Sequence, residues 1–139
     1  MTSKDDLELI AVAKRARDRA YAPYSRYAVG AAVRGEDGRI WAGCNIENIS
    51  FGLTICAERV AMAKMVSEGC RRLEKVVVVT ADGSPPCGAC LQAIREFSRN
   101  PAQVTLFLVG DSGLVHVCTL AELLPHSFAS REVRPLSVP

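Results

Sequence analysis

The sequence predicts an α/β protein, a three-layer α/β/α sandwich around a mixed sheet of about five strands. Helical and extended hydrophobic patterns alternate along the chain, and such helices pack on both faces of one sheet. Residues 76–79 are four consecutive valines, which is typical of a strand buried on both faces. The length of 139 residues, 49% of them hydrophobic, is sufficient for a buried core and predicts a single domain spanning residues 1–139.

The first half of the chain predicts a helix followed by a strand pair. Residues 4–21 place apolar side chains near helical spacing, and the segment ends before Pro23 because proline disfavours helix in the residue before it. Residues 27–33 and 39–44 have strand patterns on either side of a Gly-Glu-Asp-Gly turn at 35–38. We therefore expect an antiparallel hairpin.

The second half continues the alternation. A glycine closes the next helix, and Thr119 with Glu122 forms a capping box for the last one. The predicted elements are, in order, a helix at 55–69, a strand at 73–80, a helix at 88–98, strands at 104–109 and 114–118, and a short helix ending at Leu124.

Charge and hydropathy exclude several partners. Seventeen Lys and Arg against fifteen Asp and Glu leave a net charge of +2, too weak a field to hold a nucleic-acid backbone. No apolar run approaches the roughly 18–20 residues that a membrane span requires. The N-terminus carries Asp5 and Asp6 where a signal peptide has a basic and then an apolar segment, so we expect a cytoplasmic protein with no membrane partner.

Six cysteines are many for such a protein. Without a secretory signal, metal binding or catalysis is favoured over a disulfide framework. The isolated cysteines are interpreted as ordinary core or surface residues: Cys44, Cys70 and Cys118.

The other three cysteines lie at the starts of two predicted helices. Cys87 and Cys90 form a Cys-x-x-Cys motif that places two sulfurs within one helical turn, and Cys56 opens the preceding helix. If the two helix starts lie side by side, three thiolates converge and leave a fourth zinc position open. Glu58, two residues after Cys56, is the candidate proton carrier beside that position.

Two other interpretations compete. A Cys-x-x-Cys motif after a strand is also the pattern of a thioredoxin-like redox pair. A purely structural zinc needs a fourth protein ligand, and neither His116 nor His126 has a matching spacing.

The motifs together resemble the small, homotetrameric cytidine deaminases. A ligand two residues before a glutamate, followed by Pro-Cys-x-x-Cys, is the arrangement of zinc deaminases in general. The nucleoside branch is indicated by Asn-Ile-Glu-Asn at 45–48 and Glu-Leu-Leu-Pro at 122–125. The other matching segments are Ala-Pro-Tyr-Ser at 22–25, Val-Gly-Ala-Ala at 29–32, Val-Ser-Glu-Gly at 66–69 and Phe128.

This resemblance implies a zinc site and its chemistry. Cys56, Cys87 and Cys90 bind one zinc ion per subunit, and water in the fourth position attacks C4 of cytosine. Glu58 transfers the proton to N3 and then to the departing ammonia. Arg59 lies one turn from Cys56 and offsets the excess negative charge of three thiolates.

The resemblance also implies the substrate contacts. Asn45 and Glu47 bind the ribose 3′-hydroxyl, Tyr27 lines the base pocket, and Phe51 lies toward the 5′ end of the sugar. Ala57, together with Cys87, presents backbone groups to the base, and Phe128 stacks on the base in the site of a neighbouring subunit. Without the resemblance, Asn45 is interpreted as a turn residue, Glu47 as a solvated acid and Phe128 as a core anchor.

The chain departs from the family pattern at four places. Leu91 stands where an arginine usually follows the second cysteine, so we expect a less electrophilic zinc. Phe51 replaces a common tyrosine, Tyr27 replaces a usual phenylalanine, and the loop at 81–86 is several residues shorter. None of these changes a zinc ligand or Glu58.

The expected function is zinc-dependent hydrolysis of cytidine and 2′-deoxycytidine to the uridines and ammonia in pyrimidine salvage. One alternative is the same chemistry on another aminopyrimidine nucleoside, such as a blasticidin-type antibiotic or a modified cytosine nucleoside. Another is a zinc-stabilised binding module that has lost catalysis. The resemblance implies a nucleoside substrate and a homotetramer whose sites are completed by neighbouring subunits.

Overall fold

The computed structural model of the chain describes residues 2–129 and contains one mixed five-stranded sheet. The strands are β1 (Gly30–Gly35), β2 (Ile40–Cys44), β3 (Leu73–Val79), β4 (Thr105–Val109) and β5 (Val115–Thr119). Their order is β2-β1-β3-β4-β5, with β3 and β4 parallel and the other neighbours antiparallel. The predicted mixed sheet of about five strands is therefore confirmed.

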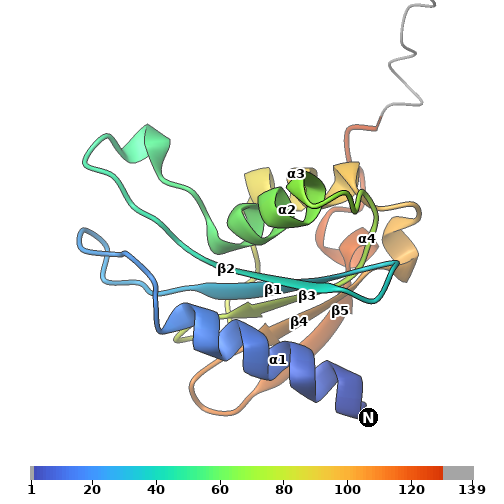
Figure 1. Cartoon of the computed structure of the whole chain (residues 1–139), viewed down its shortest axis with the longest axis horizontal. Helices are drawn as coiled ribbons and strands as arrows, with labels where there is room; N and C mark the ends of the chain where they lie inside the picture. Colours follow the sequence, from blue (N-terminus) through green and yellow to red (C-terminus); the bar gives the residue numbers. More distant parts are fainter. Residues whose placement is uncertain (1, 130–139) are drawn as a thin grey trace, which may run out of the picture.

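Helices cover both faces of this sheet, which confirms the three-layer class (Figure 1). Helix α1 (Lys4–Arg17) lies on one face, and α2 (Ala57–Ser67) and α3 (Gly88–Glu96) lie on the other. The short helices are η1 (Phe51–Leu53), η2 (Pro101–Gln103) and α4 (Leu120–Leu123). Among residues 2–129, none of the helices has the length and apolar character of a membrane span.

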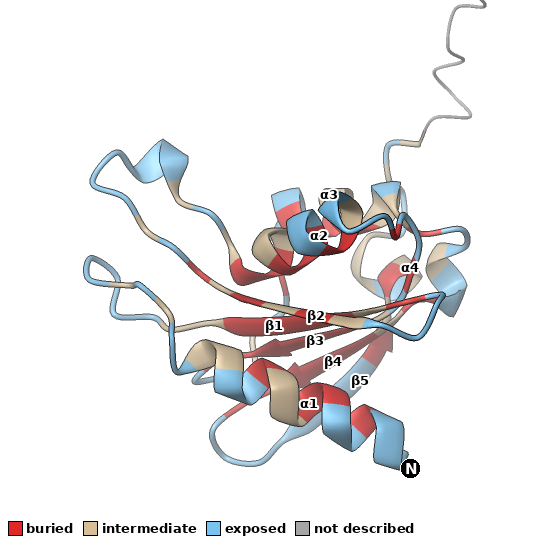
Figure 2. Ribbon diagram, in the orientation of Figure 1, coloured by how far each residue is buried: buried red, intermediate tan, exposed pale blue. Residues whose placement is uncertain are grey.

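The valine run of β3 separates two apolar layers. Val77 and Val79 pack toward α1, whereas Val76 and Val78 pack in the cluster under α2 and α3. All four side chains are almost fully buried, as Figure 2 shows for the centre of the sheet. Period-two alternation along a strand that is covered on both faces explains this arrangement.

Most predicted element ends move inward in the structure, and three of these shifts lie near the cysteine cluster or the segments that pack beside it. The first helix stops at Arg17. Tyr21 donates no helical hydrogen bond and instead pairs with the 45–47 segment, where its carbonyl oxygen accepts from Glu47 N at 2.9 Å. The first strand begins at Gly30, after residues 27–29. The second helix begins at Ala57, with Cys56 as its N-cap residue. The element types were correct in each case.

One glycine brings α2 close to the sheet. A Cβ atom added at Gly43 of β2 lies 2.7 Å from Ala61 N and 2.8 Å from Ala57 O. These are backbone atoms of the first turns of α2, so the helix start that follows Cys56 packs directly against the strand. Glycine at this position therefore fixes how deep the start of α2 lies.

Candidate active site

Three sulfur atoms meet at the starts of α2 and α3. Cys56 and Cys87 are the N-cap residues of these helices, and Cys90 lies in the first turn of α3. Their Sγ atoms all lie within 4.8 Å of one another. Tetrahedral zinc with Zn–S bonds of about 2.3 Å needs sulfurs about 3.8 Å apart, so this donor set fits zinc with a small adjustment.

The three cysteines form the one metal-competent cluster found in residues 2–129, and it contains no fourth protein ligand. The histidines do not join it: His116 is exposed on β5, and His126 lines a different cavity. A closed structural zinc therefore lacks its fourth ligand here. A simple two-cysteine redox pair does not account for the third sulfur.

The sulfurs lie where thiolates are stabilised. A hydrogen bond from the Cys90 thiol, with a further contribution from Arg59, lowers the pKa of Cys56 to about 5. The pKa of Cys90 is raised correspondingly by the Cys56 thiolate and by burial. The partial positive charge of helix N-termini also favours the thiolate form.

Glu58 lies directly beside the sulfurs and is shielded from solvent. Its side chain is 4% exposed, and its Oε2 atom accepts from the Cys90 thiol at 3.7 Å. Burial, followed by the negative charge of Cys56, raises the pKa of this carboxyl group. A carboxyl group whose protonated form is favoured beside a metal site is suited to accepting and returning a proton.

Arg59 provides positive charge behind the cluster. Its guanidinium donates to Thr54 O at 3.3 Å and to Cys56 Sγ at 3.9 Å, while its Nε–H is buried without a partner among residues 2–129. Leu91 stands next to Cys90 but is 7% exposed and belongs to the core cluster under α2 and α3. Among the described residues, Arg59 is the cation that contacts a site sulfur.

A pocket of about 270 Å³ opens onto these groups. Its floor includes Cys56, Glu58 and Cys87. Among the residues predicted to contact substrate, those that line it are Tyr27, Asn45, Glu47 and Ala57. The structure therefore brings four of the six predicted substrate contacts together with two of the sulfurs and the candidate proton carrier.

Asn45 is anchored before any ligand binds. Its Oδ1 accepts from Val29 N at 2.9 Å, and its Nδ2 donates to Tyr27 O at 2.8 Å. These bonds hold the segment that leads into β1, so Asn45 is more than the turn residue its sequence context permits. One amide N–H and one lone pair remain for a ligand.

Glu47 is also fixed in place rather than freely solvated. Its Oε1 accepts from the backbone N–H groups of Tyr24 and Ser25 at 3.0 and 3.1 Å, and its Oε2 accepts from the Ser25 hydroxyl. The Ser25 hydrogen bond is the main reason that the pKa of Glu47 is lowered. The carboxylate is thus held ionised at the pocket rim with lone pairs free for a hydroxyl donor.

Two predicted contacts lie outside this pocket. Phe51 is 72% exposed and lines a neighbouring hollow of about 400 Å³, which shares Ser25, Glu47 and Thr54 with the pocket. Phe128 is 66% exposed, and its carbonyl accepts from Gln92 Nε2 at 2.9 Å. Phe128 therefore does not anchor the core, and it does not line the pocket of its own chain.

The sequence reasoning gave no role to four polar residues that line the pocket, Ser25, Thr54, Thr80 and Ser84, or to Asp82 in the adjoining loop. Ser25 occurs in the motif at 22–25 but was given no role there. Thr80 and Ser84 line the pocket, and Asp82 hydrogen-bonds the Tyr27 hydroxyl across 55 positions of sequence. The spacing of Ser25 and Glu47 carried no signal, because their contact arises only when the two loops fold together.

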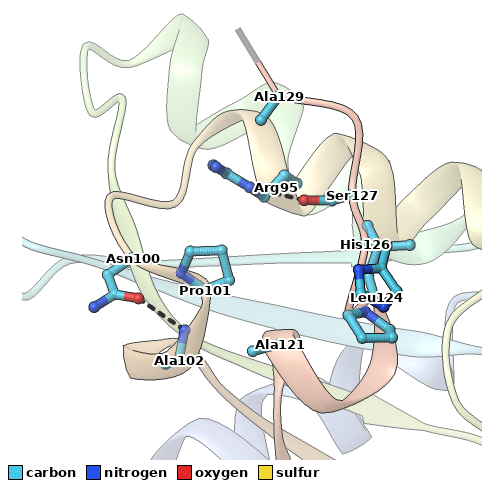
Figure 3. A pocket seen from close by; sticks show the side chains of 10 residues that line it. Arg95, Asn100, Pro101, Ala102, Ala121, Leu124, His126, Ser127 and Ala129 are labelled. Atoms are coloured by element: carbon cyan, nitrogen blue, oxygen red, sulfur yellow. Dashed lines mark hydrogen bonds between the residues drawn. The ribbon is translucent and has the colours of Figure 1, made fainter. Parts of the chain in front are cut away.

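A larger cavity, of about 450 Å³, lies between α3, η2 and α4 (Figure 3). Arg95, whose Nε donates to Ser127 Oγ at 3.1 Å, and Asn100 border it together with His126. None of its described lining residues is a thiol or a carboxylate. Its chemistry is therefore unrelated to the cluster of three cysteines.

Comparison with known proteins agrees with this geometry. The family profile described as "Cytidine and deoxycytidylate deaminase zinc-binding region" matches residues 3–106. The chain belongs to this deaminase family. The family is zinc-binding, as the three converging cysteines indicate.

Named relatives and solved structures support the assignment over nearly the whole chain. The cytidine deaminase of Sporosarcina psychrophila is 44% identical over 128 residues, covering 91% of this chain and 93% of the relative. A crystal structure of cytidine deaminase from Burkholderia pseudomallei superposes with a TM-score of 0.82 at 40% identity, covering 88% and 98% of the two chains. The blasticidin-S deaminase of Bacillus cereus is more distant, at 29% identity over 88% of this chain and 91% of its own.

Proposed function

We propose that this family member is a zinc-dependent cytidine deaminase that hydrolyses cytidine and 2′-deoxycytidine to the corresponding uridines and ammonia. The observation that carries the proposal is the buried Glu58 carboxyl group beside three converging thiols, of which Cys56 and Cys87 line the same small pocket as Glu58. Relatives named cytidine deaminase, similar along nearly the full chain, support the choice of substrate. The reaction belongs to pyrimidine salvage, as the resemblance implies.

In this proposal Cys56, Cys87 and Cys90 hold one zinc ion per subunit. When bound there, zinc supplies a Lewis acid that activates water for attack at neutral pH. The three sulfurs carry one negative charge more than the ion neutralises, and the Arg59 guanidinium near Cys56 offsets part of that excess. The absence of a fourth protein ligand among residues 2–129 leaves room for the reacting water.

Glu58 moves the protons. It accepts one from the attacking water and delivers it to N3 of the cytosine ring, so that C4 becomes tetrahedral and carries both the new oxygen and the amino group. It then transfers the hydroxyl proton to the amino nitrogen, and the C4–N bond breaks to release ammonia. Burial helps because a carboxyl group with a raised pKa holds a proton long enough to return it.

The remaining pocket residues orient the nucleoside. Asn45 and Glu47 offer one amide N–H and an ionised carboxylate to the ribose 3′-hydroxyl, which can both accept and donate. Tyr27 forms a wall of the base pocket, and the backbone of Ala57, with that of Cys87, faces the base. Phe51 extends the contact toward the 5′ end of the sugar from the adjoining hollow.

Assembly into a homotetramer is part of the proposal. The projecting arm at 45–55 carries exposed apolar side chains, among them Ile49 at 78% and Leu53 at 66% (Figures 1 and 2). Phe128 is exposed as well and is free to enter a neighbour's site. Exposed apolar surfaces of this kind are typical of protein–protein interfaces. Thiol ligands suit a cytoplasm that keeps cysteines reduced.

The test is release of ammonia from purified, zinc-loaded protein supplied with cytidine, 2′-deoxycytidine or blasticidin S, with Glu58→Gln as the control. Turnover of cytidine at kcat/KM on the order of 10⁴ M⁻¹s⁻¹ or better supports the proposal. Turnover of blasticidin S alone favours the antibiotic alternative. Zinc binding with no turnover of any of these nucleosides favours the binding module, and light scattering of the same sample gives the subunit number.

A further inference from the structure

One hydrogen bond joins two loops at the edge of the active-site pocket. The Tyr27 hydroxyl donates to Asp82 Oδ1 at 2.6 Å. Tyr27 belongs to the segment that precedes β1, and Asp82 belongs to the short loop between β3 and α3 that leads to Cys87.

Asp82 is the centre of a compact turn. Its Oδ1 also accepts from Thr80 Oγ1 and Ser84 N, both at 3.2 Å, while Gly83 N donates to Thr80 Oγ1 at 2.8 Å. Thr80, at the end of β3, is 3% exposed and cannot move easily. The Tyr27 hydroxyl is the contact that ties this turn to the opposite side of the pocket.

Tyr27 is held equally firmly on its own side. Its carbonyl accepts from Asn45 Nδ2 at 2.8 Å, and its N–H donates to Ser25 Oγ at 3.0 Å. Tyr27 lines the pocket from the segment before β1, and Thr80 and Ser84 line it from the loop that follows β3. At about 270 Å³ the pocket lies below the usual 300–1,000 Å³ of ligand sites, so small changes in its width affect what it admits.

We infer that Tyr27 and Asp82 form a specificity-determining pair that holds the two walls of the base pocket at a fixed separation. The pair acts on substrate binding rather than on chemistry, since neither side chain contacts the sulfurs or Glu58. It favours unsubstituted cytosine nucleosides over those with an added ring substituent. This inference rests on the proposed function, because it names the substrate property that the same pocket selects.

The test compares Tyr27→Phe, Asp82→Ala and the double variant with the unaltered protein, since alanine, unlike asparagine, leaves the Tyr27 hydroxyl no side-chain acceptor at position 82. Loss of one hydrogen bond at a partly exposed site predicts a roughly three- to tenfold rise in KM for cytidine, with kcat nearly constant. Discrimination between cytidine and 5-methylcytidine falls in both single variants. The double variant is no worse than Asp82→Ala alone, because the bond that Tyr27→Phe removes is already broken there.

A matched control and a second readout keep the outcomes separate. Tyr21→Phe removes a phenolic hydroxyl that has no hydrogen-bond partner among residues 2–129, and we expect unchanged kinetics. Unaltered KM and discrimination in Tyr27→Phe, or additive losses in the double variant, overturn the inference. If the unaltered protein deaminates no nucleoside, the proposed function fails. Amide hydrogen exchange at 81–84 then tests the pair: faster exchange in Tyr27→Phe supports it, and equal exchange overturns it.

Discussion

The packing of α2 against β2 at Gly43 predicts that one added methyl group will damage catalysis from outside the pocket. In Gly43→Ala the new Cβ atom lies 2.7 Å from Ala61 N, 2.8 Å from Ala57 O and 2.8 Å from the Val60 Cβ. Two of these atoms belong to the helix backbone and cannot rotate away. Restoring ordinary contact at 3.4 Å requires α2 to retreat by about 0.7 Å.

This displacement reaches the site because α2 carries two of its groups. Cys56 is the N-cap of α2 and Glu58 lies in its first turn, whereas Cys87 and Cys90 belong to α3 and stay in place. A misplacement of about 1 Å in an active site costs on the order of a hundredfold, so a smaller shift predicts a ten- to hundredfold fall in kcat/KM. Overpacking also lowers the free energy of unfolding by about 1–3 kcal/mol.

The assay measures kcat/KM for cytidine, zinc loss to a chelator and the melting temperature. Gly88→Ala is the benign control, since its Cβ meets nothing within 4 Å although it follows Cys87 directly. Gly35→Ala is the destabilised control, because its Cβ lies 2.5 Å from Cys70 Sγ at the other end of β1. Full activity in Gly43→Ala, or an equal loss in Gly35→Ala, refutes the argument that helix position sets catalytic geometry.

Three further predictions follow from the same site. Glu58→Gln keeps its zinc but loses about 10²–10⁴-fold in kcat, because the proton carrier is gone while the ligands remain; metal analysis and turnover check this. Cys87→Ala loses zinc, so its melting temperature no longer responds to added zinc. The unaltered protein does respond, because a metal that binds only the folded chain stabilises it by about 2.7 kcal/mol at a free zinc concentration of a hundred times Kd. Asn45→Ala leaves Val29 N and Tyr27 O without their partners, so urea titration should show a loss of about 1–3 kcal/mol and kinetics a raised KM.

Local chemistry explains what could be predicted from the sequence. The valine run and the alternating hydrophobic patterns reflect which neighbouring residues are buried, and burial follows the repeat of each element. The predicted strand and helix types were therefore correct. The convergence of the three cysteines was predictable because two of them lie within one helical turn and the third opens the preceding helix. Element ends were less predictable: β1 begins at Gly30 rather than Tyr27 because the Asn45 side chain, distant in sequence, holds the intervening backbone. The hydrogen bond between Tyr27 and Asp82 could not be predicted from the sequence either, because it also joins residues that are distant in the sequence.

The replacement of a usual arginine by Leu91 affects the electrostatics of the site. Three thiolates on a divalent ion leave one excess negative charge, and the family pattern offers two arginines against it. Here the second position is an apolar side chain, 7% exposed in the core beneath α3, so Arg59 carries that task among the described residues. An apolar neighbour also excludes water, and charges interact more strongly where the effective dielectric constant is low. In the proposed zinc site, charge neutralisation therefore depends on the placement of Arg59 against Cys56.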